Sequence, residues 1–169
     1  MAQNPEDENV LDQARAIFEE SKQETQPLHC SLPTETFLGL SSTLIFIKYH
    51  LPKKAAEREL AESLVERYYE TLGESDPTVD KQGAIVPDSI AFDLNIRETD
   101  LIIQQLMRQI GNARQIGNVA SRPTVKDIAF GSISNSMACL VSLHTEWIRA
   151  GGQPRPEFVR FREGVEPSK

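Results

Sequence analysis

The sequence is poor in the residue types that build most catalytic and metal sites. Among its 169 residues are two cysteines, one tryptophan and three histidines. His29, His50 and His144 stand apart from one another, and none has a second ligand at the spacing of a metal motif. The chain has no phosphate-binding loop, no dinucleotide-binding glycine pattern and no nucleophile elbow. We therefore expect a protein that is not an enzyme and that uses no metal or cofactor.

Disulfide frameworks and membrane-spanning runs are also missing. Cys30 and Cys139 are too few for a disulfide scaffold, so two buried thiols in a reducing compartment are expected. The most hydrophobic run, 37–51, is 15 residues long and contains Lys48 and His50, which makes it too short and too polar to cross a bilayer. The acidic N-terminus lacks the apolar core of a signal peptide. These absences predict a cytosolic protein without a membrane partner.

Charge is distributed unevenly along the chain. The formal net charge is −7, and residues 1–100 carry 20 acidic against 9 basic residues. Residues 101–169 reverse this balance, with 9 basic against 5 acidic residues. The field of the whole molecule repels phosphate, but exposed charges are largely screened beyond about 10 Å at ~0.1 M salt. A local basic surface can therefore still bind a polyanion.

Hydrophobic periodicity predicts helices over most of the chain. The predicted helices cover 6–24, 35–50, 53–72, 97–112 and 124–150, with Thr34 and Thr124 as N-caps. The segment 74–88 is predicted to be a loop, with a short extended piece at 84–86. Together these elements predict an all-α fold: a four-helix bundle in 34–152, an N-terminal arm helix and loop in 1–33, and an extended C-terminal tail in 153–169.

The stretch from Leu101 to Asp127 is the strongest functional signal. It carries four cations and no acid before its last residue. The candidate RNA-binding residues are Arg108, Arg114, Arg122, Lys126 and Asp127. Guanidinium groups in a flexible linker after Gly111 can approach phosphates bidentately, and the start of the next helix adds free N–H groups. Because the stretch has no aromatic residue, contacts to the nucleic-acid backbone are expected. The alternative is that the arginines are solvated or cap helix ends.

The last helix and the tail provide a second candidate surface. Apolar residues from Phe130 to Trp147 recur with the three- and four-residue steps of helix packing. His144 lies on this stripe and is expected to be a core or interface histidine with a hydrogen-bond partner. The tail combines cations with aromatic residues. The candidate residues for a subunit or partner interface are Trp147, Phe158, Arg160 and Phe161.

Four short motifs occur in order along the predicted bundle. They are Val86-Pro87-Asp88-Ser89 before the third bundle helix, Gly111-Asn112-Ala113-Arg114 at its end, Val125-Lys126-Asp127 at the start of the fourth, and Ile148-Arg149-Ala150-Gly151-Gly152 with Phe158 at its exit. In this order they resemble motifs of the coat proteins of rod-shaped plant viruses of the tobamovirus type. The resemblance implies a four-helix bundle that assembles helically with its own copies and encloses single-stranded RNA, with Arg114 at the matching distance from the Pro-Asp-Ser turn. Lys126 departs from the family's pattern, which has an acid there.

Three other features are Ile47-Lys48-Tyr49-His50-Leu51-Pro52, Tyr68-Tyr69 and the spacing from Trp147 to Pro154. They give a second resemblance, to flexuous-filament coat proteins. Both resemblances imply a virion or host-cytoplasm location, single-stranded RNA as a partner, and acidic faces between subunits. The alternative is a cytosolic all-helical adaptor or regulatory protein that binds a protein partner through its last helix and basic tail.

Overall fold

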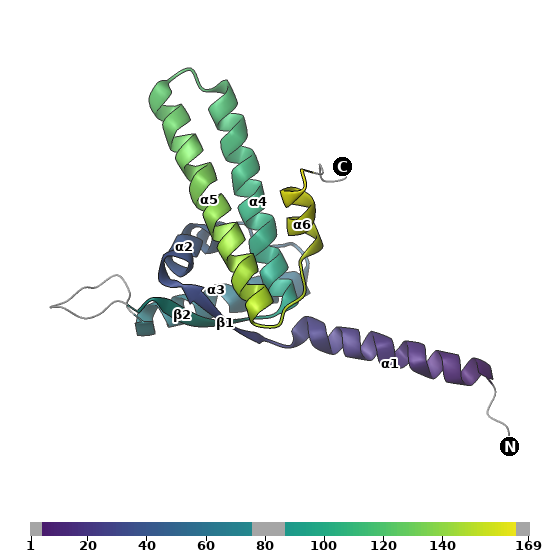
Figure 1. Ribbon diagram of the computed structural model, residues 1–169. Coiled ribbons are helices and arrows are strands. Elements are labelled where there is room, and N and C mark those ends of the chain that lie inside the picture. The colour runs from purple at the N-terminus through teal and green to yellow at the C-terminus, as the bar shows by residue number, and fades with distance from the viewer. Residues whose placement is uncertain (1–4, 76–86, 165–169) are drawn as a thin grey trace.

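The computed structural model describes residues 5–75 and 87–164, and most of these residues are helical (Figure 1). In chain order the elements are α1 (Pro5–Thr25), β1 (Leu28–Pro33), α2 (Thr34–Tyr49), α3 (Ala55–Ser75), β2 (Ser89–Leu94), α4 (Ile96–Val119), α5 (Pro123–Arg149) and α6 (Pro156–Arg162). The expectation of a mainly helical chain is confirmed. The loop expected at 74–88, with its extended piece at 84–86, lies largely outside the described residues.

The expectation of an all-α fold needs one correction, because β1 and β2 form a two-stranded antiparallel sheet. Leu28 pairs with Leu94 at one end of the ladder, and Cys30 pairs with Phe92. Apolar residues alternate along both strands, so each strand turns one face toward the core. This alternation is visible in the sequence, but the two strands lie almost sixty residues apart and neither reads as a strand on its own.

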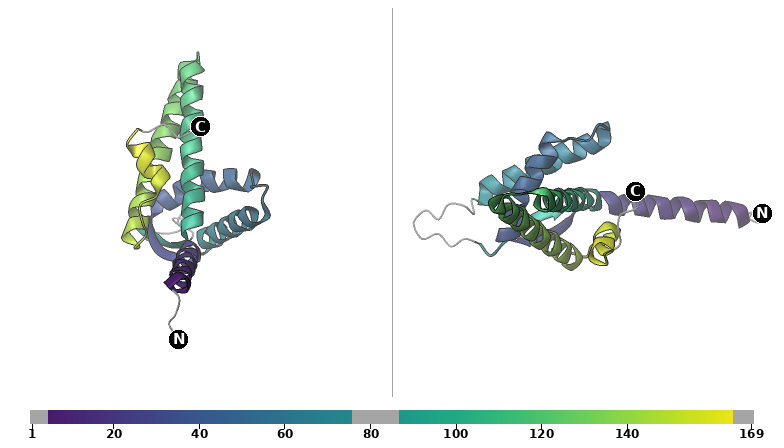
Figure 2. Two further views of the ribbon diagram at one scale, coloured as in Figure 1. Left: turned by 90° about the vertical axis from the view of Figure 1, so that its right-hand side faces the viewer. Right: turned by 90° about the horizontal axis from the view of Figure 1, so that it is seen from above.

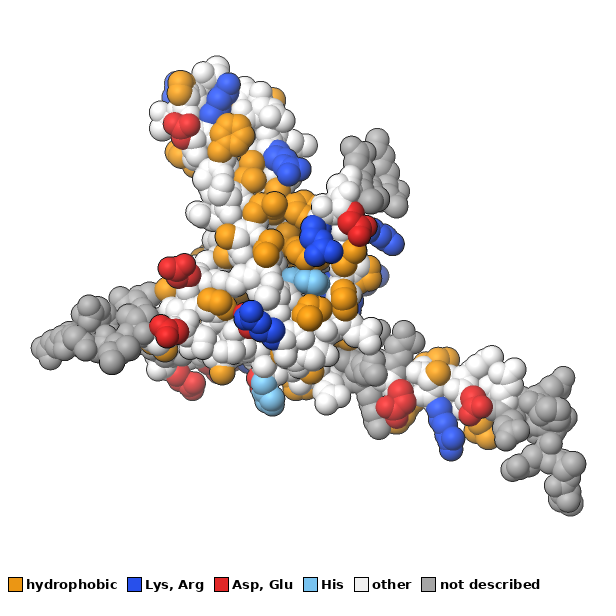
Figure 3. Space-filling view, in the orientation of Figure 1, with side chains coloured by type: hydrophobic (Ala, Val, Ile, Leu, Met, Phe, Trp, Pro, Cys, Tyr) orange, Lys and Arg blue, Asp and Glu red, His pale blue; other side chains and the backbone are white. Residues whose placement is uncertain are grey.

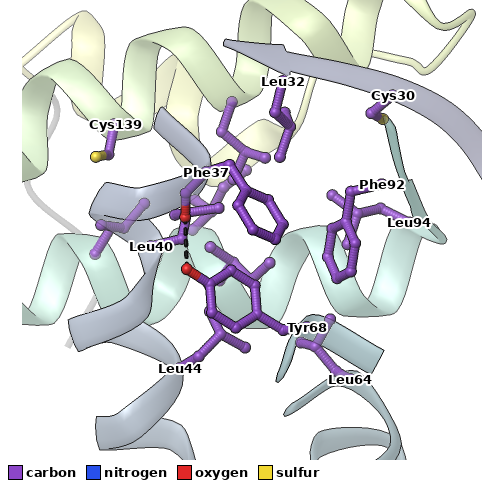
Figure 4. Packing of buried hydrophobic residues seen from close by; sticks show 14 of the residues in the cluster. Cys30, Leu32, Phe37, Leu40, Leu44, Leu64, Tyr68, Phe92, Leu94 and Cys139 are labelled. Carbon is purple, nitrogen blue, oxygen red and sulfur yellow. Dashed lines mark hydrogen bonds between the residues drawn. The ribbon is translucent and has the colours of Figure 1, made fainter. Parts of the chain in front are cut away.

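The core lies where the sheet, α2, α3 and the lower halves of α4 and α5 meet. The Phe37 ring stacks on Tyr68 with ring centroids 4.5 Å apart, and Phe92 contacts both rings edge-on. The Tyr68 hydroxyl donates a 2.7 Å hydrogen bond to the Phe37 carbonyl oxygen, which satisfies a buried polar group (Figure 4). Helix α2 is apolar on most sides but not buried on all of them, because Phe46 is 46% exposed.

Helices α4 and α5 form a long antiparallel hairpin that projects from this core (Figures 1 and 2). Helix α4 starts at a capping box in which the Asn95 side chain accepts from the Glu98 N–H and Glu98 accepts from the Asn95 N–H. The prediction of a flexible linker after Gly111 is wrong, because α4 continues to Val119. The face that includes Gly117 is buried against α5, and this packing outweighs the low helix propensity of glycine.

The two ends of the chain differ from one another. Helix α1 confirms the predicted N-terminal helix and extends away from the rest of the molecule (Figure 2). The tail, expected to be extended from residue 153, instead folds into α6, which packs beside α4 (Figure 1). Burial of the Phe158 side chain stabilises this short helix. Among the described residues, no helix combines the length and the apolar character needed to cross a membrane.

Candidate nucleic-acid interface

The projecting hairpin carries the basic stretch that stands out in the sequence. Arg108 and Arg114 lie on α4, Arg122 is the N-cap residue of α5, and Lys126 follows in its second turn. All four side chains are exposed, and within 5–75 and 87–164 none of them forms an ion pair with a carboxylate. Since no acid occurs from Leu101 to Lys126, the hairpin presents uncompensated positive charge at a distance from the acidic body.

The start of α5 contributes less to anion binding than the sequence suggests. Thr124 is not the N-cap, because Pro123 occupies the first helical position and Arg122 precedes it. Pro123 has no N–H, and the N–H groups of Val125 and Lys126 both donate to the Arg122 carbonyl oxygen, at 3.1 and 3.2 Å. Asp127 is exposed and lies beyond the first turn. The expected cluster of free N–H groups is therefore reduced, and the charge at this end comes from side chains.

The tip of the hairpin is also unusually apolar. Five large hydrophobic side chains are exposed there: Ile116, Val119, Val125, Ile128 and Phe130. They lie on both sides of the turn at Ala120–Arg122, among the cations named above. The stretch 101–127 contains no aromatic residue, but the fold adds Phe130 from just beyond it, beside Gly117 and 3.8 Å from the position of an added Cβ. A surface of exposed apolar groups and cations can contact both the bases and the phosphates of a single strand.

A groove of about 760 Å³ opens between α4, α5 and α6. Its apolar wall consists of Met107, Ile110, Met137, Val141, Phe158 and Phe161. Four arginines line it as well: Arg108 and Arg114 from α4, and Arg160 and Arg162 from α6. Hydrophobic side chains gather on this face of the hairpin, with Lys or Arg side chains beside them (Figure 3). The arginines of the basic stretch and those of the C-terminal tail, which are far apart in the sequence, therefore line the same groove.

Helix α6 is held in position by a small polar network. The Arg155 guanidinium donates to both carboxylate oxygens of Asp100, at 2.6 and 2.8 Å. The Arg155 N–H donates to His144 Nε2 at 3.1 Å, and the His144 ring stacks on Phe158 with centroids 4.1 Å apart. Burial lowers the pKa of His144, and the positive charges of Arg162 and Arg155 lower it further. His144 is therefore a neutral hydrogen-bond acceptor under Phe158, and of the two expected roles, core or interface, it has the core one.

The predicted interface residues separate into two groups. Trp147 is 1% exposed and Phe158 is 5% exposed, so both belong to the core of the chain and neither offers a surface to a partner. The Trp147 Nε1–H donates to the Gln153 carbonyl oxygen at 2.9 Å, which closes the end of α5. Arg160 is exposed and Phe161 is half-buried at the groove. The sequence alone does not distinguish core residues from interface residues. Apolar residues at helical spacing give the same pattern whether they pack on a helix of the same chain or on a partner.

Two further features of the described chain are a second hollow and two buried cysteines. A second hollow of about 550 Å³ between α2 and α5 has a lining rich in small and neutral polar residues, including Gly39, Ser42, Gly131 and Ser132. Both cysteines are buried thiols, and burial raises the pKa of Cys30 to about 11, with smaller contributions from Asp93 and Glu146. In the part of the chain that the structure describes, no three His, Cys, Asp or Glu side chains come close enough to hold a metal ion.

Compared with protein-family models, with curated protein sequences and with solved structures, the chain shows no match.

Proposed function

We propose that this protein is a structural protein that binds single-stranded RNA along the α4–α5 hairpin and assembles helically with its own copies. The observation that carries the proposal is the hairpin itself. It projects from an acidic body and carries four exposed cations with no acid among them, and none of the four forms an ion pair within the described residues. Arg114, Arg122 and Lys126 contact phosphates, while the exposed apolar side chains at the tip contact bases.

The order of elements supports the same proposal. In the rod-shaped coat proteins that the sequence resembles, RNA lies between the third and fourth bundle helices, and α4 and α5 are the corresponding elements here. We treat α2 to α5 as that bundle, with the β1–β2 sheet at its base. On this assignment Arg114 lies on the last third of α4 and Arg122 at the start of α5.

Binding to an unstructured RNA oligonucleotide, followed by fluorescence anisotropy over a range of salt concentrations, tests the RNA half of the proposal. The affinity of a protein for single-stranded nucleic acid falls with salt with a log–log slope of about 0.7 per neutralised phosphate. Replacing Arg114, Arg122 and Lys126 by alanine should weaken binding and reduce that slope by about 2.

The matched control replaces Lys48, Lys53 and Lys54 by alanine, which removes the same charge from exposed positions outside the hairpin. This variant should keep most of the affinity. Equal losses in the two triple variants would show that net charge alone governs binding, and the hairpin site would be rejected.

The adaptor interpretation keeps one supporting observation, the arginine-lined apolar groove between α4, α5 and α6. A groove of this kind suits an amphipathic helix of a protein partner. Assembly distinguishes the two functions, because an adaptor stays a small oligomer under conditions in which a coat protein forms long particles.

A further inference from the structure

Helix α1 carries an apolar stripe that nothing in the described chain covers. Val10, Leu11 and Ile17 are 64%, 62% and 67% exposed. Val10, Ala14 and Ile17 have the i, i+4 and i+7 spacing of an amphipathic surface, and Leu11 lies next to Ala14 at the i, i+3 spacing. Large side chains that recur at this spacing on a helix of 21 residues are the pattern of a segment that docks on another surface.

The rest of α1 is strongly acidic. Pro5–Thr25 contains seven acidic and two basic residues, so the arm combines an apolar stripe with negative charge. The groove between α4, α5 and α6 has the complementary character. Its wall is apolar, and among the described residues that line it are four arginines and a single acid, Glu157.

The connection between α1 and the body directs the arm outward. Only Gln26 and Pro27 separate the helix from β1, whose first residue, Leu28, is already paired with Leu94. Proline fixes its own φ and restricts the residue before it to extended conformations, which makes a short connection of this kind stiff. Helix α1 contacts the body where it meets α4 and then points away from it (Figures 1 and 2). A sharp reversal would be needed for the arm to reach the groove of its own chain.

We propose that α1 of one copy docks in the α4–α5–α6 groove of a neighbouring copy. The apolar stripe packs on the groove wall near Val141 and Phe161, and the acids of α1 lie against Arg108 and Arg160. The occupant is an acidic helix because the groove wall between the arginines is apolar, a poor surface for a hydrated phosphate backbone. The inference deepens the assembly half of the proposed function, since each copy then has one arm and one receptor and can extend a chain of subunits head to tail.

Disulfide trapping between two differently sized chains tests the docking in the absence of RNA. One full-length chain carries Ala14→Cys in the stripe, and a second, tagged to change its size, carries Val141→Cys in the groove wall. The native cysteines are buried and stay in place. After mild oxidation of the mixture, the disulfide-linked pair of unequal chains is expected, and peptide mass spectrometry identifies the bond.

The control is Ala16→Cys, the same change on the opposite side of the same helix, which should give a several-fold lower yield with the Val141→Cys chain. Arg160→Glu in the groove chain should also lower the yield, because it places a negative charge against the acidic arm. Both arm variants replace an exposed alanine, so folding affects them alike.

Three results would overturn the inference. Equal yields from the two arm positions would show random collision. A disulfide formed only within a chain carrying both Ala14→Cys and Val141→Cys would place the arm on its own groove. Loss of RNA binding in Arg160→Glu without any change in the arm cross-link would assign the groove to RNA. Since no RNA is present during trapping, failure here leaves the hairpin test of RNA binding intact.

Discussion

At the residue scale, the end of α5 depends on a close contact between glycine and tryptophan. Gly151 has a φ of 97°, and the Gly152 N–H donates to the Trp147 carbonyl oxygen at 2.9 Å, the six-to-one bond of a helix that ends in a left-handed residue. A Cβ built on Gly152 would lie 2.2 Å from the Trp147 ring. The ring therefore packs directly on glycine backbone, and α6 follows from this turn.

Gly152→Ala should lower the free energy of unfolding by about 1–3 kcal/mol, because a buried indole must move to admit the methyl group. Urea denaturation measures the change. Gly131→Ala is the matched control, since nothing lies within 4 Å of an added Cβ at this helical position and alanine is the better helix former there. Loss of stability in both variants, or in neither, would contradict the packing described for Trp147.

At the element scale, α6 is a short helix that depends on its contacts. Seven residues are too few for a stable isolated helix, so Phe158, the Arg155–Asp100 ion pair and the His144 acceptor hold it in place. The same helix supplies Arg160 and Phe161 to the groove. The state of His144 therefore affects both the stability of the chain and the shape of a binding surface.

Acidification should weaken this attachment. The pKa of folded His144 lies below its ordinary value of about 6.5, so the unfolded chain binds a proton more readily than the folded chain. The stability that neutral His144 contributes is present above pH 6.5 and is lost as pH falls through the folded pKa. Protonated imidazole also has no acceptor for the Arg155 N–H.

His144→Gln isolates this contribution, because glutamine retains an acceptor and does not titrate. Between pH 7 and pH 5, its free energy of unfolding should fall less than that of the unmodified chain. The protection of the α6 amides against hydrogen exchange should also fall less. Parallel pH profiles for the two proteins would show that carboxylates alone produce the acid dependence.

At the scale of the whole molecule, charge is separated along the fold. The acidic arm α1 and an acidic body lie at one end, and the basic hairpin projects from the other (Figures 1 and 3). Copies that meet body to body repel one another through their carboxylates near neutral pH, when the formal net charge is −7. Neutralising these carboxylates therefore favours contacts between bodies, and RNA bound along the hairpins would offset the repulsion between their cations.

Negative-stain microscopy across pH 5 to 8 should show rods or filaments as the pH falls, and longer ones when single-stranded RNA is present. The RNA-dependent lengthening should be absent in the Arg114, Arg122 and Lys126 triple alanine variant and retained in the lysine control variant. Small particles of uniform size under every condition would reject the assembly half of the proposed function and favour the adaptor.

Features that depend on neighbours in the sequence could be predicted. The main helices follow from apolar residues at helical spacing, as in α3, where Leu60, Leu64 and Tyr68 share one side. The basic character of 101–127 needs only a count of charges, and the amphipathic arm at 6–24 follows from local periodicity. Both stay true in any fold that keeps these helices.

Features that depend on contacts between distant segments were decided by the tertiary structure. The alternating strands β1 and β2 are each too short to be recognised until they pair with one another. Gly111 and Gly117 predict a break, yet α4 continues to Val119, and Gly117 packs against Ala129 and Phe130 of α5. The groove exists only because α6 folds back on the hairpin, so that Arg160 and Arg108 line the same groove. Local pattern reports how a segment prefers to fold, whereas burial against a distant partner decides which side chains form a core and which form a surface.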